Sequence, residues 1–335
     1  MLARLLWTLL ATTLATTLGV PGGAQAADAG GGGAAPASLF VPATSALALH
    51  ARGATVLDAR ERGFVWGHIP GAQPVDWRDF RDGWGRTGRL HPDPAQMASR
   101  LSALGVAGDR PVLIYGDAGR GFGEEGRIAW LLAYLGHRQV YILDGGWPAW
   151  GQVGGPIARG LAGRPVRPEG PGIPFVPSPQ PGLRTDKAAV QRVVQGLEGA
   201  PRPTAPLILD VRTAAEWRGA TPYFEARGGH IPSARHLDWQ QLLGSDGRLR
   251  SPAELHALLS SLGVAPPSGP SAASDASPAA EPDIVVYCTG GVRSAFVWAV
   301  LRSLGYRHVR NYDGSFWEWA ADPSLPVTRP PGPSP

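Results

Sequence analysis

The chain has 335 residues, which suggests about two domains of ordinary size. Its net charge is +4, and no Lys/Arg run of the nucleic-acid-binding type occurs, so we exclude DNA and RNA as partners. The hydrophobic fraction of 43% predicts a packed core, and the single cysteine excludes an internal disulfide.

The first 26 residues have the pattern of a cleavable signal peptide. Arg4 supplies a positive charge, residues 5–20 are apolar, and residues 24–26 (Ala-Gln-Ala) form a small-residue cleavage motif. A membrane anchor is the alternative, but the apolar run is shorter than the roughly 20 residues that a span needs. We therefore expect a periplasmic or secreted protein, cleaved near Ala26, with no stable membrane insertion after cleavage.

Segments rich in Pro, Gly, Ser and Ala divide the rest of the chain. We predict a disordered N-terminal segment at 27–40, a first domain at 41–155, a linker at 156–183, a second domain at 184–325 with a low-complexity insert at 265–282, and a Pro-rich tail at 326–335.

The two predicted domains contain the same motifs in the same order. The matching pairs are 54–60 with 206–212, 67–72 with 229–234, 88–90 with 247–249, 104–106 with 262–264, 112–115 with 284–287, and 144–150 with 313–319. Such a series indicates a tandem duplication. Each copy alternates short apolar strands with amphipathic helices, which predicts an α/β fold with a mainly parallel sheet flanked by helices in each domain.

Cys288 lies where ligands bind in such sheets, directly after the predicted strand at 284–287. A Gly-containing loop follows it, and then an apolar stretch at helical spacing. Backbone N–H groups that converge in the loop, the helix N-terminus and the charge of Arg293 all favour a thiolate. An inert structural cysteine is the alternative that this context disfavours. We predict that Cys288 is the nucleophile and that its binding loop consists of Thr289, Gly290, Gly291, Val292, Arg293 and Ser294.

A thiolate in an anion-binding loop suits two reactions. In sulfur transfer, Cys288 takes an outer sulfur as a persulfide and passes it to an acceptor. In phosphate-ester hydrolysis, the cysteine becomes a phosphocysteine. Only four residues separate Cys288 from Arg293, one fewer than a phosphatase loop needs. This spacing favours sulfur transfer over a cysteine phosphatase or an arsenate reductase.

The chain resembles the two-domain rhodanese-like sulfurtransferases of the thiosulfate and 3-mercaptopyruvate type, over nearly all of residues 45–325. The motifs are Cys-Thr-Gly-Gly-Val-Arg-Ser at 288–294, Leu-Asp-Val-Arg at 209–212, Gly-His-Ile-Pro at 67–70 and 229–232, and Asp-Gly-Ser-Phe at 313–316. The resemblance implies tandem rhodanese-like domains, of which only the second reacts. Gly116 stands at the position that matches Cys288 in the first copy, which agrees with an inactive first domain.

The resemblance also implies the substrates. Sulfur would move from a small anionic donor, thiosulfate or 3-mercaptopyruvate, to cyanide, a thiol or a thioredoxin-like acceptor. The alternative function is that of a non-catalytic persulfide carrier or docking protein, which receives its sulfur from a partner protein. Such a carrier would turn over small donors slowly.

This sequence departs from the family at the positions that hold the donor. Basic residues or a Ser in the loop of relatives are replaced here by Thr289 and Gly290, and an Arg that mercaptopyruvate-preferring relatives use is Glu216. We therefore expect Arg293 to orient the donor, with Arg218 and Arg227 as weaker candidates for the substrate cleft. Arg212 and Glu216 are four residues apart, which predicts a structural pair.

Histidines and tryptophans recur in both copies. For His230, we predict a structural role, since a pre-ionised thiolate needs no base. His68 is a candidate for the substrate cleft, because the matching His of mercaptopyruvate-type relatives lines it. For Trp147, Trp150, Trp317 and Trp319, we predict core packing, with a wall of the cleft as the alternative.

A dinucleotide-binding fingerprint, Gly121-x-Gly123-x-x-Gly126, occurs in the first copy. The charges of Glu124 and Glu125, and the place of this segment in the repeat, argue against a bound dinucleotide. The sequence contains no cluster of His, Cys, Asp or Glu residues with the spacing that metal ligands usually have. We therefore expect no cofactor and no metal.

Overall fold

The computed structural model describes residues 38–163, 172–197, 206–267 and 282–329. The predicted signal peptide lies outside the described residues, as do residues 27–37 of the predicted N-terminal segment. The same holds for parts of the predicted linker, insert and tail, at 164–171, 268–281 and 330–335. Among the described residues, none of the helices combines the length and the apolar character that crossing a bilayer requires.

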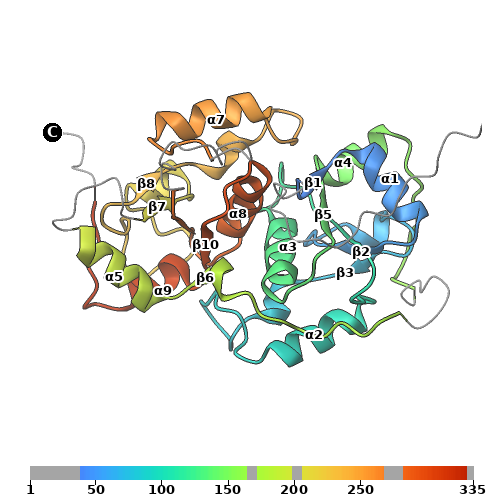
Figure 1. Ribbon diagram of the computed structural model, residues 1–335, viewed down its shortest axis with the longest axis horizontal. Helices are drawn as coiled ribbons and strands as arrows, with labels where there is room; N and C mark the ends of the chain where they lie inside the picture. Colours follow the sequence, from blue (N-terminus) through green and yellow to red (C-terminus); the bar gives the residue numbers. More distant parts are fainter. Residues whose placement is uncertain (1–37, 164–171, 198–205, 268–281, 330–335) are drawn as a thin grey trace, which may run out of the picture. The chain divides into compact units, whose positions relative to one another are not determined.

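The first half of the described chain forms a five-stranded parallel sheet (Figure 1). Its strands lie in the order β1 (Phe40–Val41), β5 (Val140–Leu143), β4 (Val112–Tyr115), β2 (Thr55–Asp58) and β3 (Gln73–Pro74). Strand β4 is buried along its whole length and pairs with both β2 and β5. A short, continuous apolar run is what a central parallel strand requires, because both of its faces are covered.

The second half repeats this sheet. Its strands lie in the order β6 (Arg184–Thr185), β10 (Val309–Tyr312), β9 (Ile284–Tyr287), β7 (Leu207–Asp210) and β8 (Arg235–His236), all in parallel pairs. Every strand holds the place of its counterpart in the first sheet. The predicted α/β fold with tandem domains is therefore confirmed.

Helices follow the strands in equivalent positions in the two halves. The first half contains α1 (Ala43–Ala51), α2 (Pro94–Ala103), α3 (Glu124–Tyr134) and α4 (Gly146–Gln152). The second half contains α5 (Lys187–Leu197), α6 (Ala214–Trp217), α7 (Pro252–Ser261), α8 (Arg293–Ser303) and α9 (Ser315–Ala321). Short 3₁₀ helices lie between them at Phe64–Trp66, Trp77–Phe80, Pro181–Leu183 and Trp239–Leu242.

Helices α3 and α8 lie side by side and join the two halves (Figure 1). One hydrophobic core runs through both halves and includes Trp130 of α3 and Phe296 of α8. A Cβ atom on Gly126 would lie 2.4 Å from the Cα of Phe296, so only glycine allows this approach. A Cβ atom on Gly123 would likewise lie 2.8 Å from the Cβ of Phe296. Two glycines of the dinucleotide-like motif thus have a packing role between the helices.

The described part of the predicted linker lies against the first half. Ala158 pairs with His68, the N–H of Gly108 donates to the carbonyl of Ile173, and the N–H of Ser178 donates to Leu135. The predicted domain boundaries themselves stay predictions.

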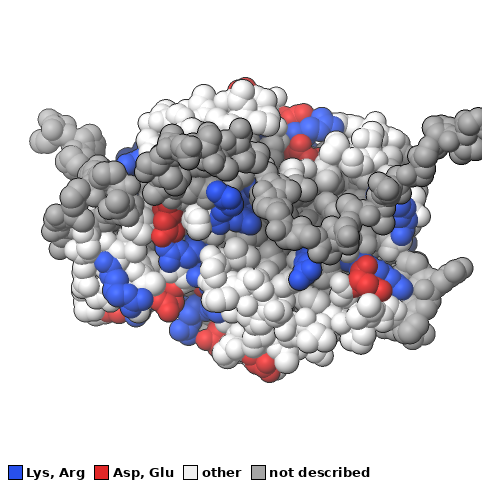
Figure 2. Space-filling view, viewed as in Figure 1, with Lys and Arg blue, Asp and Glu red and all other residues white. Residues whose placement is uncertain are grey.

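On the face shown in Figure 2, acidic and basic side chains lie close to one another at several places.

Candidate active site

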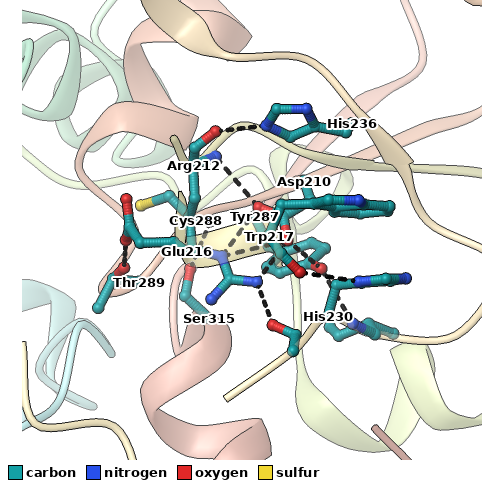
Figure 3. Close-up of polar contacts among 12 residues, drawn as sticks. Asp210, Arg212, Glu216, Trp217, His230, His236, Tyr287, Cys288, Thr289 and Ser315 are labelled. Carbon is teal, nitrogen blue, oxygen red and sulfur yellow. Dashed lines mark hydrogen bonds and ion pairs between the residues drawn. The ribbon is translucent and has the colours of Figure 1, made fainter. Parts of the chain in front are cut away.

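Cys288 is the first residue after β9, at the carboxyl end of the central strand of the second sheet. Its thiol is only 1% exposed. The backbone N–H of Cys288 donates to Oγ of Ser315 at 3.2 Å (Figure 3). The carbonyl of Cys288 accepts the N–H of Phe316. These bonds connect Cys288, at the end of β9, to the start of α9, which follows β10. The ends of two neighbouring strands therefore fix the position of Cys288.

The loop after Cys288 turns back on the sulfur. The N–H of Gly291 donates to Sγ at 3.1 Å, and the hydroxyl of Ser294 lies 3.6 Å from it. Ser294 is buried, and its single hydroxyl proton has two alternative acceptors, Sγ of Cys288 and Oδ1 of Asn311, the latter at 2.7 Å. Gly291 has a φ of 78°, which side chains rarely adopt, and a Cβ there would lie 2.7 Å from the carbonyl of Asp313. The turn that aims this N–H at the sulfur therefore requires glycine.

The environment lowers the pKa of the Cys288 thiol. Burial alone raises this pKa, but the charge of Arg293 and hydrogen bonds from the Ser294 hydroxyl and from the backbone of Ser294 and Gly290 lower it further than burial raises it. A thiolate with a lowered pKa is the reactive form of a cysteine.

Arg293, the first residue of α8, forms a buried pair with Glu216. Its Nη1 donates to Oε2 at 2.7 Å and its Nη2 to Oε1 at 2.8 Å. The hydroxyl of Thr289 accepts a bond from Arg293 and donates one to Glu216, the latter drawn in Figure 3. Burial raises the pKa of Glu216, but hydrogen bonds and charge from Arg293 outweigh burial and lower it to about 2. The guanidinium is therefore already neutralised by a carboxylate.

The predicted pair of Arg212 and Glu216 is wrong. Arg212 bonds to Asp210, from Nε to Oδ1 at 2.9 Å and from Nη2 to Oδ2 at 2.6 Å, and it donates to the carbonyl of Gly229. The i,i+4 rule holds within a helix, and α6 begins only at Ala214, after the strand end that carries Arg212. Figure 3 shows Arg212 and Asp210 joined in this way.

A cavity of about 150 Å³ opens in front of Cys288. Both halves line it: Glu61, Trp77, Arg78, Phe122 and Glu124 come from the first, and Tyr223, Cys288, Thr289, Gly290, Val292, Arg293 and Trp317 from the second. The rings of Phe122 and Tyr223 meet edge to face across the two halves, with 6.0 Å between their centroids. The half that has no nucleophile thus supplies part of the wall of this cavity.

Charged groups in this wall are mostly paired. Arg78 donates to Glu61 at 2.5 Å and also to Asp76. Glu124 is 4% exposed and accepts the backbone N–H of Phe122 at 2.9 Å. Burial raises the pKa of Glu124 by more than that N–H and the charge of Arg78 lower it.

In the first half, the position equivalent to Cys288 is filled by a carboxyl group. A Cβ on Gly116 would lie 2.0 Å from Oε2 of Glu125. Glu125 is buried, and among the described residues its Oε2 has no hydrogen-bond partner. Burial raises the pKa of this carboxyl to about 8, so it is mainly protonated at neutral pH. The first half therefore lacks both the nucleophile and the space for one.

Three predicted cleft residues do not line the cavity. Arg227 donates to four backbone carbonyls, those of Trp319, Ala320, Asp322 and Leu325. His68 stacks on Phe64 and shares a hydrogen bond with its carbonyl. Arg218 ends helix α6 as its C-cap. These placements correct the predicted cleft roles of Arg218, Arg227 and His68.

Residues of the repeated motifs have equivalent structural surroundings. His230 stacks on Trp217 and pairs through its backbone with Thr328, as His68 does with Ala158. Trp150 and Trp319 are fully buried in the core, whereas Trp317 lines the cavity. Core packing and a cleft wall both occur among the repeated tryptophans.

Sequence reasoning missed half of the residues in the cavity wall. It did not single out Glu61, Trp77, Arg78, Phe122 or Tyr223, and it treated Glu124 only as evidence against a dinucleotide. A signal existed for Phe122 and Glu124, because their segment is the counterpart of the Cys288 loop in the repeat.

Comparison with known proteins agrees with this architecture. The Rhodanese-like domain family matches the chain twice, at residues 43–152 and 192–322. A sulfur carrier protein, TtuD of Thermus thermophilus, is 32% identical over 78% of this chain and 86% of its own length.

Two further relatives are named as sulfurtransferases. A thiosulfate sulfurtransferase of Corynebacterium glutamicum is 31% identical over 82% of this chain and 85% of its own. A probable 3-mercaptopyruvate sulfurtransferase of Pseudomonas aeruginosa is 35% identical, over 78% of this chain and 84% of its own.

Proposed function

Since this chain belongs to the rhodanese family and is a sulfurtransferase, we propose that Cys288 is the nucleophile that carries the transferred sulfur as a persulfide. One observation carries this proposal. The buried Sγ of Cys288 accepts the N–H of Gly291 and lies at the cavity in front of α8, with its pKa lowered. These features favour a thiolate that attacks an outer sulfur.

The loop suits both steps of a persulfide cycle. In the first step, the thiolate of Cys288 forms a bond to the outer sulfur of thiosulfate, and the sulfur–sulfur bond of the donor breaks to release sulfite. In the second step, cyanide attacks the outer sulfur of the persulfide, and the bonding electron pair returns to Cys288 as thiocyanate leaves. Loop N–H groups and the N-terminus of α8 stabilise the anionic sulfur in both states.

Arg293 has a different role here from the one that its place in the loop predicts. Because Glu216 engages both terminal nitrogens of its guanidinium, Arg293 supports the thiolate and the loop, and it is not free to clamp an anionic donor. The anionic donor, thiosulfate or 3-mercaptopyruvate, would then be held mainly by loop N–H groups through its sulfur.

A persulfide carrier is the second candidate function. The same neutralised arginine favours it, because a carrier that receives sulfur from a protein partner needs no clamp for a small anion. The similarity to a protein named as a sulfur carrier supports this candidate. A carrier would form a stable persulfide and turn over slowly with small donors.

Intact-mass spectrometry tests both candidates. Wild type and Cys288→Ser would be incubated with thiosulfate or 3-mercaptopyruvate, and then with cyanide. A gain of one sulfur atom on wild type alone, reversed by cyanide with release of thiocyanate, is the expected result. Rapid repetition of this cycle supports the enzyme, and a persistent persulfide with slow turnover supports the carrier. Sulfur gained by the Ser variant would overturn the role of Cys288.

We also propose that the chain is exported to the periplasm or secreted, with cleavage of its signal peptide near Ala26. The charge at Arg4, the apolar residues 5–20 and the Ala-Gln-Ala motif support this. N-terminal sequencing of the protein from fractionated cells would find Ala27 first in the periplasmic or secreted fraction. An intact Met1 in the cytoplasmic fraction would contradict export.

A further inference from the structure

The cavity in front of Cys288 lacks the free positive charge that an anionic ligand would need. Its two cationic side chains, Arg78 and Arg293, are both bonded to carboxylates. The pair of Arg293 and Glu216 is bidentate and buried, and Arg78 bonds to Glu61 and Asp76. An anionic group in this cavity would have to compete with carboxylates that are already in place.

Glu124 gives the wall an unbalanced negative charge. It is almost fully buried, and its carboxylate accepts a hydrogen bond from the backbone N–H of Phe122. It forms no ion pair with any described residue. The raised pKa of this carboxyl agrees with such a position, because a well-paired carboxylate would have a lowered one.

The rest of the wall is aromatic. Trp77, Phe122, Tyr223 and Trp317 line the cavity. The guanidinium of Arg293 lies 5.5 Å from the ring centroid of Tyr223, and that of Arg78 lies 5.1 Å from a ring centroid of Trp77. Aromatic faces beside a carboxylate are a favourable environment for an ammonium group, since the ring quadrupoles and the carboxylate attract the same charge.

The size of the cavity limits the ligand. A volume of about 150 Å³ favours a small ligand. We expect a two-carbon thiol to place its sulfur at Cys288 and its other end toward the aromatic rings and Glu124, because these residues line the same cavity.

We propose that this cavity selects small, positively charged thiols as sulfur acceptors, with Glu124 as the residue that determines the preference. The inference rests on the proposed function, because it concerns discharge of the Cys288 persulfide. The acceptor sulfur forms a bond to the outer sulfur, the bond between that sulfur and Cys288 breaks, and its electron pair returns to Cys288. The acceptor's proton stays with the new persulfide, so no oxidant or reductant is needed.

The test separates loading from discharge. Cys288 would first be converted to its persulfide with thiosulfate, 3-mercaptopyruvate or inorganic polysulfide, and excess donor removed. The loaded protein would then be mixed with cysteamine, 2-mercaptoethanol or mercaptoacetate, which are similar in size and differ in charge. Mass spectrometry follows the loss of sulfur with time.

Each rate is compared between wild type and Glu124→Gln, because this ratio cancels the intrinsic reactivity of each thiol. We expect Glu124→Gln to slow the discharge of sulfur to cysteamine about 5- to 10-fold relative to discharge to 2-mercaptoethanol. The same variant should speed discharge to mercaptoacetate relative to 2-mercaptoethanol, because one nearby negative charge is lost. Asp109→Asn is the matched control. It removes one carboxylate from an exposed turn before β4, at the opposite edge of the sheet, and should leave all three rates unchanged.

Added salt provides a second test. The difference between wild type and Glu124→Gln in the rates for cysteamine and mercaptoacetate, each relative to the neutral thiol, should shrink as ionic strength rises, because salt screens the charge of Glu124. If a persulfide forms but all three thiols respond alike to Glu124→Gln and to salt, this inference is overturned while the proposed function stands. If no donor forms a persulfide, both are overturned.

Discussion

The backbone N–H of Leu90 donates a hydrogen bond of 2.7 Å to Oδ2 of Asp313, from the first half of the chain to the second. An equivalent contact runs from the second half to the first, where the N–H of Leu249 donates to Oδ1 of Asp144 at 2.9 Å. Each Gly-Arg-Leu motif thus binds the Asp-Gly turn of the other half. The duplication produced two reciprocal contacts, and the one at Asp313 lies beside the Cys288 loop, since the carbonyl of Asp313 packs on Gly291.

Asp313→Asn should destabilise the protein more than Asp144→Asn does. Asp313 is 2% exposed and also bonds to Arg184, whereas Asp144 is partly exposed. We expect a loss of about 2–4 kcal/mol in unfolding free energy for Asp313→Asn, since it breaks a partly buried ion pair, and about 1 kcal/mol for Asp144→Asn. Urea denaturation at pH 7 measures both values. Equal losses would show that the two contacts contribute alike.

Glu216→Gln should remove a source of acid sensitivity. Because Arg293 holds the folded pKa of Glu216 at about 2, below its ordinary value, the pair stabilises the protein above the unfolded pKa. That stability is lost as the pH falls from the unfolded pKa through about 2. Glu216→Gln should therefore cost on the order of 3 kcal/mol at pH 7 and flatten the acid limb of the stability profile. Urea titrations across this pH range measure it, and an unchanged acid limb would contradict the assignment.

Replacement of Arg293 should raise the pKa of Cys288. The charge of Arg293 is the largest influence that lowers this pKa, so Arg293→Gln should move the pKa of Cys288 upward. The rate of alkylation by iodoacetamide as a function of pH reports the midpoint. A double variant, Arg293→Gln with Glu216→Gln, controls for the unpaired carboxylate. A midpoint that stays unchanged in both variants would show that hydrogen bonds alone set the pKa.

Glu125→Gln should stabilise the protein at alkaline pH. Burial raises the folded pKa of Glu125 to about 8, so its contribution to stability is full below the unfolded pKa and is lost as the pH rises through about 8. The variant cannot ionise, so its melting temperature should exceed that of wild type at pH 9 and match it near pH 5. Sulfur transfer should be unchanged, because Glu125 lies behind Gly116 and outside the cavity. Parallel melting profiles across this range would contradict a buried, protonated carboxyl.

Much of the fold and the centre of the site could be predicted from the sequence, because they depend on contiguous residues. The strand at 284–287, the glycine-containing loop and the helix after it form one local unit, and this unit alone places Cys288 beside converging N–H groups. The tandem α/β architecture followed from motifs that recur in one order. Such features are set by local pattern and repetition, which a sequence displays directly.

Only the tertiary structure decided what surrounds the sulfur. Arg293 lies 77 residues after Glu216 in the sequence, and the pair forms because α6 and α8 both begin at the carboxyl edge of one sheet. The i,i+4 spacing suggested Arg212 as the partner of Glu216, but Arg212 bonds to Asp210 at the end of β7. The cavity wall, with Glu124 and Phe122, comes from the half without a nucleophile. Charge pairing and cavity shape depend on which distant segments the fold brings together. The sequence alone therefore singled out Cys288 as the candidate nucleophile, but it did not reveal the residues that surround the sulfur.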